Sequence, residues 1–323
     1  MADDDLGPGL DRAMWPLTVL ATLFLGLRLY CKIRHRRPLW WDDYVLVASW
    51  VALVLSTALE TVAVAQGLGK SSAQLVASLQ DHHDTNDTND NNDAVDVVVD
   101  AIRAISEYSY IAGFFTILAA MWGKASFALT LLRIATPGGW IRYAVWFILV
   151  TVLLVMGGGA VIQWVQCWPV ASLWDHTIPG TCLSSEMVQH YDLFMSVYSG
   201  TMDIVLALLP WRIIWHVQIS KKEKFGALFA MGMGVFAGLA SILKIAALFA
   251  IGNPDMSTTV ILFVFGTAEA AITIMAASIP VLRALMQRSK RPKAAAPRRD
   301  GEPPARPTTP QRLSQQKEAD LEW

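Results

Sequence analysis

The sequence predicts an all-α, polytopic membrane protein: a bundle of seven transmembrane helices with its N-terminus outside and its C-terminus in the cytosol. Three observations support this fold class. Hydrophobic residues make up 54% of the chain and charged residues only 16%, whereas soluble domains carry about 25% charged residues. Seven apolar segments are long enough to span a bilayer as helices. Basic residues gather in alternate connections, which is typical of cytosolic loops.

The spanning helices are expected where apolar residues run for about 20 positions. Aromatic side chains favour the headgroup level and mark several ends, such as Trp41 before the second segment and Trp164 at the end of the fourth. The membrane domain covers residues 14–285 and follows an extracytoplasmic N-terminus, residues 1–13. We expect its helices at about Met14–Ile33, Tyr44–Gln66, Tyr108–Ile134, Tyr143–Val165, Tyr191–Trp215, Phe225–Ile251 and Thr258–Leu282.

Charged residues alternate between the two sides of the predicted membrane. Lys and Arg follow the first, third, fifth and seventh segments, and examples are Arg34, Arg133, Lys221 and Arg288. Acidic residues dominate the N-terminus and the other connections. The positive-inside rule therefore places the N-terminus outside and the C-terminus in the cytosol.

Small residues indicate where helices approach one another. Gly157, Gly158 and Gly159 are consecutive in the fourth segment, and Gly234 and Gly238 are four positions apart in the sixth. Residues without bulky side chains let the backbones of neighbouring membrane helices come close. We expect helix interfaces at both places.

Two segments are too polar to pack. Asp81–Asp93 is a low-complexity run on the outside and residues 286–323 form a basic cytosolic tail, so we expect both to be disordered. Asn86 opens an Asn-Asp-Thr glycosylation sequence in the outer run, although short acceptor patterns also arise by chance. His82 and His83 lie among aspartates there, but the pattern of a calcium loop is absent, so we expect no metal site.

Cys167 and Cys182 flank the outer connection between the fourth and fifth segments. The outside is an oxidising compartment, where disulfides form and persist. We therefore predict a Cys167–Cys182 disulfide, with Cys31, at the cytosolic end of the first segment, as a free thiol.

The most informative residues are the charges inside the spanning segments: Glu60, Lys124, Asp203, Lys244 and Glu269. Charged residues at such depth are costly and face the interior of a bundle, a partner or water. Counting along the helices places Glu60 and Lys244 in an outer tier. Lys124, Asp203 and Glu269 form a deeper tier. We expect the bundle to pack around Lys124, because a single spanning helix could not shield its ammonium group from lipid.

The deeper tier has one positive charge and two acids. Lys124 can pair with one carboxylate, so we expect either Asp203 or Glu269 to keep its proton. These two acids and Glu60 are the candidate catalytic residues, and all five intramembrane charges are candidate binding residues. Helical spacing predicts inward faces made by Asp192, Ser196, Ser199 and Asp203 and by Gly266, Glu269, Thr273 and Pro280. A purely structural ion-pair network is the alternative.

Ordered motifs run through most of the membrane part. They are Arg28-x-Tyr30, Trp41-Asp42-Asp43-Tyr44, Gly67-x-Gly69, Lys124-x-Ser126, Leu132-Arg133-Ile134, Gln166-Cys167-x-Pro169 with Trp174 and Cys182, Asp203 with Pro210, Ala240-Ser241, Glu269 and Pro280-x-Leu282-Arg283. This set resembles the fungal rhodopsin-domain family, from about residue 28 onward. The resemblance implies a seven-helix integral membrane protein of the satratoxin-cluster type, related to CFEM-linked pathogenesis receptors but without the CFEM domain. Lys70 and Lys244 depart from the residues usual in the family.

The resemblance implies a receptor-like protein that senses a small lipophilic molecule, in the plasma membrane or an endomembrane and associated with secondary metabolism. The alternative is a membrane-embedded enzyme whose buried carboxyl groups catalyse cyclisation or epoxide opening of a secondary metabolite. Expected partners are the lipid bilayer, a small lipophilic ligand or substrate and a cytosolic signalling protein, with no nucleic acid. We expect no cofactor, because the last segment has Glu269 and lacks the lysine that retinal would need.

Overall fold

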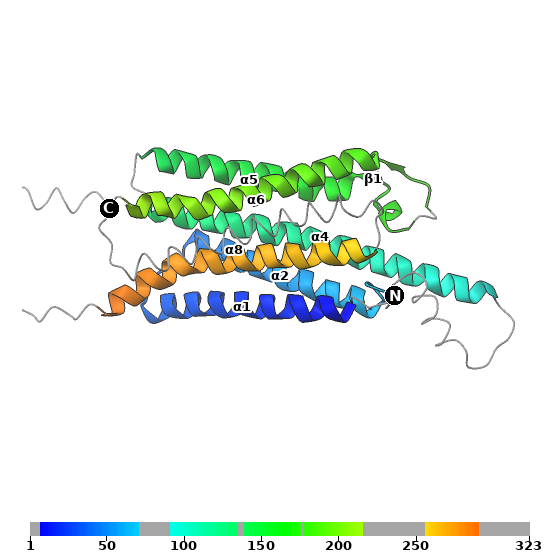
Figure 1. Cartoon of the computed structure of the whole chain (residues 1–323), viewed down its shortest axis with the longest axis horizontal. Coiled ribbons are helices and arrows are strands. Elements are labelled where there is room, and N and C mark those ends of the chain that lie inside the picture. The colour runs from blue at the N-terminus through cyan, green and yellow to red at the C-terminus, as the bar shows by residue number, and fades with distance from the viewer. Residues whose placement is uncertain (1–6, 71–90, 135–138, 176–177, 216–255, 291–323) are drawn as a thin grey trace, which may run out of the picture. The chain divides into compact units, whose positions relative to one another are not determined.

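The chain is an all-α polytopic membrane protein. The structure is a computed structural model that describes residues 7–70, 91–134, 139–175, 178–215 and 256–290. Its elements in chain order are α1 Gly7–Arg34, α2 Trp41–Ala65, α4 Asn91–Ile134, α5 Trp140–Val165, β1 Cys167–Trp168, the 3-10 helix η1 Val170–Leu173, β2 Thr181–Cys182, α6 Ser185–Trp215 and α8 Met256–Lys290 (Figure 1).

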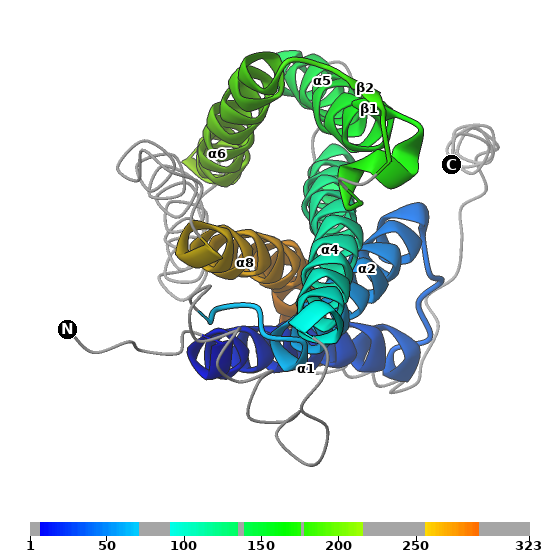
Figure 2. The same cartoon turned by 90° about the vertical axis from the view of Figure 1, so that its right-hand side faces the viewer.

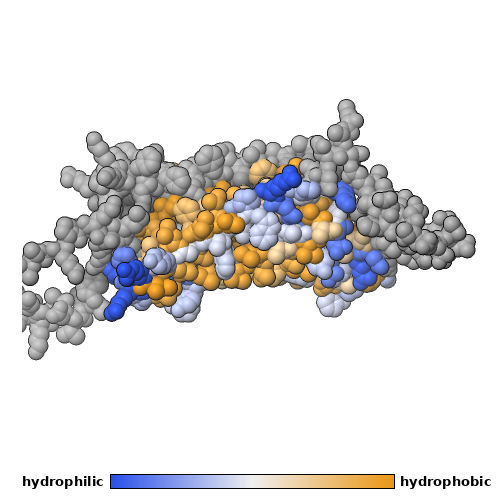
Figure 3. All heavy atoms as spheres, turned by 90° about the horizontal axis from the view of Figure 1, so that it is seen from below, coloured by the Kyte–Doolittle hydropathy of each residue, from blue (hydrophilic) through white to orange (hydrophobic). Residues whose placement is uncertain are grey.

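Six helices within the described part are long and apolar enough to cross a membrane. They correspond to six of the seven predicted segments. The remaining prediction, Phe225–Ile251 with its Gly234 and Gly238, lies outside the described residues, as do residues 81–90 and the tail from residue 291. On the side where α1 lies, apolar side chains cover most of the middle and hydrophilic ones gather at both ends (Figure 3).

The helix α1 shows how the sequence separates a lipid face from a packed face. Large apolar side chains such as Leu23 and Leu27 are exposed, as expected for contact with lipid tails. The buried positions recur every three or four residues and form one stripe against the bundle. They are Gly7, Leu10, Met14, Thr18, Ala21, Leu25, Arg28 and Lys32.

Local chemistry fixes both ends of α2. The Trp40 N–H donates a hydrogen bond of 3.1 Å to the Asp43 carboxylate, and an acid in the first turn also suits the helix dipole. After the helix, Gly67 and Gly69 have φ angles of 112° and 98°, a region that glycine enters without the penalty of a side chain. This turn buries Leu68, which explains the Gly-x-Gly pattern.

The helix α4 is longer than predicted. It begins at Asn91, 17 positions before the expected Tyr108, and the last three residues of the predicted disordered run are helical. The prediction was wrong because Asp100 and Arg103 interrupt the apolar run on which it relied. The extension still has one apolar face, which buries Ile105 against residues of α1, α2 and α8.

Most of the core is built around α4. Figure 2 looks along the helices and shows α4 between α2 and α5, with α6 and α8 on one side of it. The backbones approach closely at Gly123, where an added Cβ would lie 3.2 Å from both Ser49 of α2 and Thr273 of α8. The predicted small-residue contact on α5 is also present, because a Cβ at Gly158 would lie 2.9 Å from the Tyr191 hydroxyl of α6.

A disulfide closes the connection between α5 and α6. Cys167 and Cys182 are bonded and face each other in the antiparallel pair β1–β2, as predicted. The Leu183 N–H donates a 2.8 Å hydrogen bond to the Gln166 carbonyl just outside the bridge. Closing a loop of 15 residues lowers the entropy of the unfolded chain, by about 3 kcal/mol in the chain-entropy model.

Non-reducing peptide mass spectrometry should recover Cys167 linked to Cys182 and should find Cys31 alkylated without reduction, because Cys31 is a free thiol. The Cys31 peptide serves as the internal control for labelling. Alkylation of both outer cysteines in the unreduced native protein would contradict the pairing.

Topology is tested with reporters at both predicted sides. A reporter fused after Leu285 should lie in the cytosol, and one inserted within Asp81–Asp93 should lie outside, since basic residues follow the odd-numbered segments. Each fusion is read by protease protection in sealed vesicles. Protection of both reporters from the same side would contradict the predicted helix count.

Candidate functional site

The predicted deeper tier forms a cluster in the structure. The Lys124 ammonium on α4 is fully buried and lies 2.8 Å from Asp203 Oδ1 on α6 and 2.6 Å from Glu269 Oε1 on α8. The Ser199 hydroxyl of α6 donates a 2.6 Å hydrogen bond to the same Glu269 oxygen. We call Lys124, Asp203 and Glu269 the charge triad. The prediction that Lys124 has a carboxylate partner is confirmed, with two partners.

The two acids bind Lys124 differently. Both Asp203 oxygens lie within 3.0 Å of the ammonium nitrogen, as expected for an ionised carboxylate that presents both oxygens to a cation. Glu269 Oε1 accepts hydrogen bonds from both Lys124 and Ser199. Because both oxygens of Asp203 face the cation, we expect Asp203 to be the ionised partner, which leaves Glu269 as the acid that keeps a proton.

The inward faces predicted for α6 and α8 are correct around the triad and wrong at one edge. Ser199, Asp203, Glu269 and Thr273 are buried. Asp192, however, is exposed, because the outer end of α6 lies where the bundle meets polar surroundings and a carboxylate is best solvated.

Glu60 lies in a second polar cluster near the predicted outer side. Its side chain is fully buried on α2, and its Oε1 lies 3.0 Å from the Ser56 hydroxyl and 3.5 Å from that of Thr116 on α4. Its Oε2 lies 3.5 Å from the Thr267 hydroxyl on α8. We call these four residues the outer cluster. Lys244, predicted to share this tier, lies outside the described residues, as does Asn86.

A third cluster, at the predicted cytosolic side, joins Arg28 and Lys32 of α1 to Asp42 and Asp43 of α2. Arg28 Nε lies 3.0 Å from Asp43 Oδ1 and Nη2 lies 2.5 Å from Asp42 Oδ2. Lys32 forms an ion pair with Asp43 and lies 3.6 Å from Asp42. Two cations face two acids, so this inner cluster balances its own charge.

The inner cluster also reaches α4 and α8. Arg28 Nη1 donates a 2.6 Å hydrogen bond to the Ala277 carbonyl of α8, close to Pro280, which has no N–H and loosens the hydrogen bonding of that turn. On α4, the Ser126 hydroxyl donates a 2.6 Å hydrogen bond to the Asp42 carbonyl. Four helices therefore meet at one buried polar group.

Sequence reasoning missed the inner cluster. It used Arg28, Asp42 and Asp43 as motif residues and counted Arg28 and Lys32 among the basic residues at the cytosolic end of the first segment, without pairing the cations with the acids. A signal was present, because Arg28 and Lys32 are one turn apart on the buried stripe of α1, and the two acids open the next helix. The short connection brings these helix ends together.

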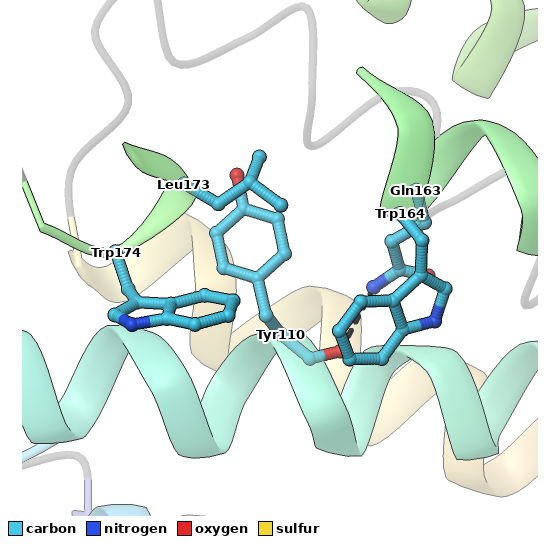
Figure 4. A pocket seen from close by; sticks show the side chains of 5 residues that line it. All are labelled: Tyr110, Gln163, Trp164, Leu173 and Trp174. Carbon is cyan, nitrogen blue, oxygen red and sulfur yellow. Dashed lines mark hydrogen bonds between the residues drawn. The ribbon is translucent and has the colours of Figure 1, made fainter. Parts of the chain in front are cut away.

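A recess at the other end of the bundle, beside the disulfide, is lined by aromatic residues. Tyr110 of α4 stands between Trp164 and Trp174, with Leu173 and Gln163 completing the wall (Figure 4). Its empty volume of about 150 Å³ includes open solvent, whereas sites for drug-sized ligands have about 300–1,000 Å³. Its lining contains no member of the three charged clusters.

The arrangement can hold charge, exchange protons and couple helices. Within the described ranges, no group of three or more His, Cys, Asp or Glu side chains is placed to hold a metal ion. The triad and the outer cluster both include residues of α4 and α8, and the triad adds α6. The inner cluster joins α1 to α2 and reaches α4 and α8 through hydrogen bonds. Together, the fold and the buried clusters define a helical multi-spanning membrane protein with a charged interior.

Comparison with known proteins identifies the family. The family model described as the fungal rhodopsin domain matches residues 27–288, so the chain belongs to the fungal rhodopsin domain family. This confirms the resemblance inferred from the motifs. No solved structure matches the chain.

Two curated relatives match over a limited part. One is "Fugralins biosynthesis cluster protein 2" of Gibberella zeae, 31% identical over 86 residues, and the other is "SAT4 family membrane protein" of Emericella nidulans, 29% identical over 80 residues. Each match covers 25% of this chain and 20% of the relative. The chain therefore matches about a fifth of the length of each relative.

Proposed function

We propose that this protein is a receptor-like membrane protein that senses a small lipophilic molecule, and that the charge triad is the element that responds. The observation that carries the proposal is the bonding of Lys124, which holds α6 and α8 to α4 through two different carboxylates. The family and the seven-segment pattern support the same class by analogy.

A sensor needs two states that its ligand binds with different affinity. The triad is a candidate switch between two such states, because one ammonium binds two acids. Loss of either ion pair would weaken the link between α4 and one of its two partner helices, α6 or α8. A ligand whose polar group binds Lys124, or takes its place at Glu269, would favour the state in which one of these ion pairs is broken. Breaking a buried ion pair costs several kcal/mol unless the helices repack. Loss of one ion pair in the triad would therefore make the helices repack, and their ends would move.

The signal would leave on the cytosolic side, where a signalling protein would bind. The inner cluster ties α1, α2, α4 and α8 together there, so a shift of α4 or α8 at the triad would act on the same four helices. Arg and Lys in the cytosolic connections offer a basic surface to a partner, although the positive-inside bias also explains them.

The second candidate is an enzyme that modifies a secondary metabolite within the membrane. The name of the Gibberella zeae relative, which places that protein in a biosynthesis cluster, favours this class. General acid catalysis needs a carboxyl group that holds a proton and faces the substrate. Asp203 does not fit this role, because both of its oxygens face Lys124, so Glu269 or Glu60 would have to act.

Deletion of the gene, followed by metabolite profiling and transcript measurement, separates the two functions. A sensor predicts that transcripts of many genes change together and that no single precursor accumulates. Complementation with the parent chain should restore the transcripts and is the control. Accumulation of one precursor with unchanged transcripts would contradict the proposal and support the enzyme.

A further inference from the structure

Glu60 of the outer cluster is a carboxyl group with an unusual set of neighbours. It is fully buried, and no ion pair to it occurs in the part of the chain that the structure describes. The acid facing this region from α1, Asp11, accepts a 2.9 Å hydrogen bond from Thr61, the residue next to Glu60, and adds negative charge nearby. An ionised Glu60 would be a buried charge near a second acid.

The contacts around Glu60 form a series of three. Glu60 Oε1 lies 3.0 Å from Ser56 Oγ, which lies 2.5 Å from Thr116 Oγ1, which lies 3.0 Å from the Ala112 carbonyl. Three hydrogen bonds in series need three hydrogens. Each hydroxyl carries only one, so Ser56 and Thr116 supply two. Ser56 Oγ also lies 3.1 Å from the same Ala112 carbonyl, so four contacts compete for the two hydroxyl hydrogens. A proton on Glu60 supplies a third hydrogen, so a neutral Glu60 leaves fewer of these contacts without one than an ionised Glu60 does.

We propose that Glu60 is a buried proton-binding site: a neutral carboxylic acid that donates to Ser56, which donates to Thr116, which donates to the Ala112 carbonyl. The bound ligand is a proton held between Glu60 and Ser56, and the four oxygens of the series come from α2 and α4. Release of the proton requires the series to reverse or break, because Ala112 can only accept. The protonation of Glu60 is thereby coupled to the contact between α2 and α4.

An ionised Glu60 agrees less well with the distances. Of the three hydroxyl groups around it, only that of Ser56 lies at 3.0 Å, and those of Thr116 and Thr267 are each 3.5 Å away. Carboxylates that stay ionised in a protein interior draw several short donors or a cation. The long contacts fit a neutral acid.

A metal cation is also a poorer fit than a proton. Oxygen ligands around a cation such as calcium lie at about 2.3–2.6 Å from it, which holds neighbouring ligands more than 3 Å apart. The oxygens of Ser56 and Thr116 are only 2.5 Å apart. Such a contact needs a shared hydrogen between the two oxygens.

Close packing of α8 confines the outer cluster. A Cβ at Gly266 would lie 2.7 Å from the Thr116 methyl group, so glycine lets α8 approach that side chain. Thr267 then sits over Glu60 Oε2. This packing keeps water from the carboxyl group and helps it retain its proton.

Infrared spectroscopy of the full chain in lipid nanodiscs tests the proposal. The parent should show a neutral carboxylic acid carbonyl band that shifts on labelling with ¹³C-glutamate. The E60Q variant should lose one component of this band, while E269Q should retain that component. In T116V the Glu60 component should move, because the series loses the Thr116 hydroxyl. This last comparison remains informative should E60Q fail to fold.

Stability measurements complete the test. E60Q should unfold at nearly the parental midpoint, because the amide N–H₂ can donate to Ser56 in place of the acid. An unchanged carboxylic acid band in both E60Q and T116V would overturn the proposal. A sodium-dependent rise of the parental midpoint that disappears in E60Q would also overturn it, because the site would then bind a metal cation.

Discussion

Replacement of Lys124 by methionine is expected to cost about 3–5 kcal/mol of folding free energy, the range found when one partner of a buried ion pair is removed. The side chain is fully buried and its ammonium contacts Asp203 and Glu269. Methionine has similar length and no charge, so the loss would come from an ionised carboxylate left without its cation. The measurement is the unfolding midpoint and the folded yield of purified protein.

The matched control is Arg142→Met, which removes a cation from the exposed surface at the start of α5. Surface substitutions away from special contacts usually stay within about 0.5 kcal/mol, so this variant should resemble the parent. Equal stability of K124M and R142M would mean that the triad carries no net electrostatic contribution to folding.

Replacement of Arg28 by methionine should destabilise the protein by a similar amount, about 3–5 kcal/mol. Its guanidinium is fully buried and donates to Asp42, Asp43 and the Ala277 carbonyl. Without it, Lys32 alone faces two carboxylates. We expect low folded yield and a lowered midpoint in the same assay.

Arg28→Lys separates charge from geometry. Lysine keeps the positive charge but lacks the planar fork that reaches three acceptors from one position. We expect an intermediate loss of about 1.5–3 kcal/mol, the value of a hydrogen bond to a charged group. A lysine variant as stable as the parent would show that charge balance alone holds the inner cluster together.

The helices were predictable because each spanning segment is a long apolar run. The predicted and observed ends differ little for α2 and α5. The start of α4 was not predictable by this criterion, because residues around Asp100 and Arg103 are polar on one side and apolar on the other. Its apolar side is buried only once α1, α2 and α8 supply a partner surface.

The triad was predictable in part. The depth of Lys124, Asp203 and Glu269 along their helices follows from counting residues, and a buried lysine requires an acid. The difference between the two acids depends on which oxygens face Lys124, and this follows only from the rotation of α6 and α8.

The inner and outer clusters were less accessible to sequence reasoning. Glu60 was identified as an intramembrane acid, but its hydroxyl neighbours come from residues 56, 116 and 267, which are far apart in the chain. The Ala277 carbonyl that binds Arg28 belongs to the backbone, so no side-chain pattern could reveal it.

The proposed function assigns the response of the protein to the charge triad. The most direct measurement compares Asp203→Asn and Glu269→Gln for folded yield and for restoration of the deletion phenotype, at equal protein level in the membrane. Asp203→Asn should lower the folded yield, because it removes the ionised partner of Lys124. Glu269→Gln should fold like the parent, since its amide oxygen can still accept from Lys124 and Ser199, yet fail to restore the phenotype. Two variants that both fold normally and restore the phenotype fully would contradict the claim and leave the triad a packing feature.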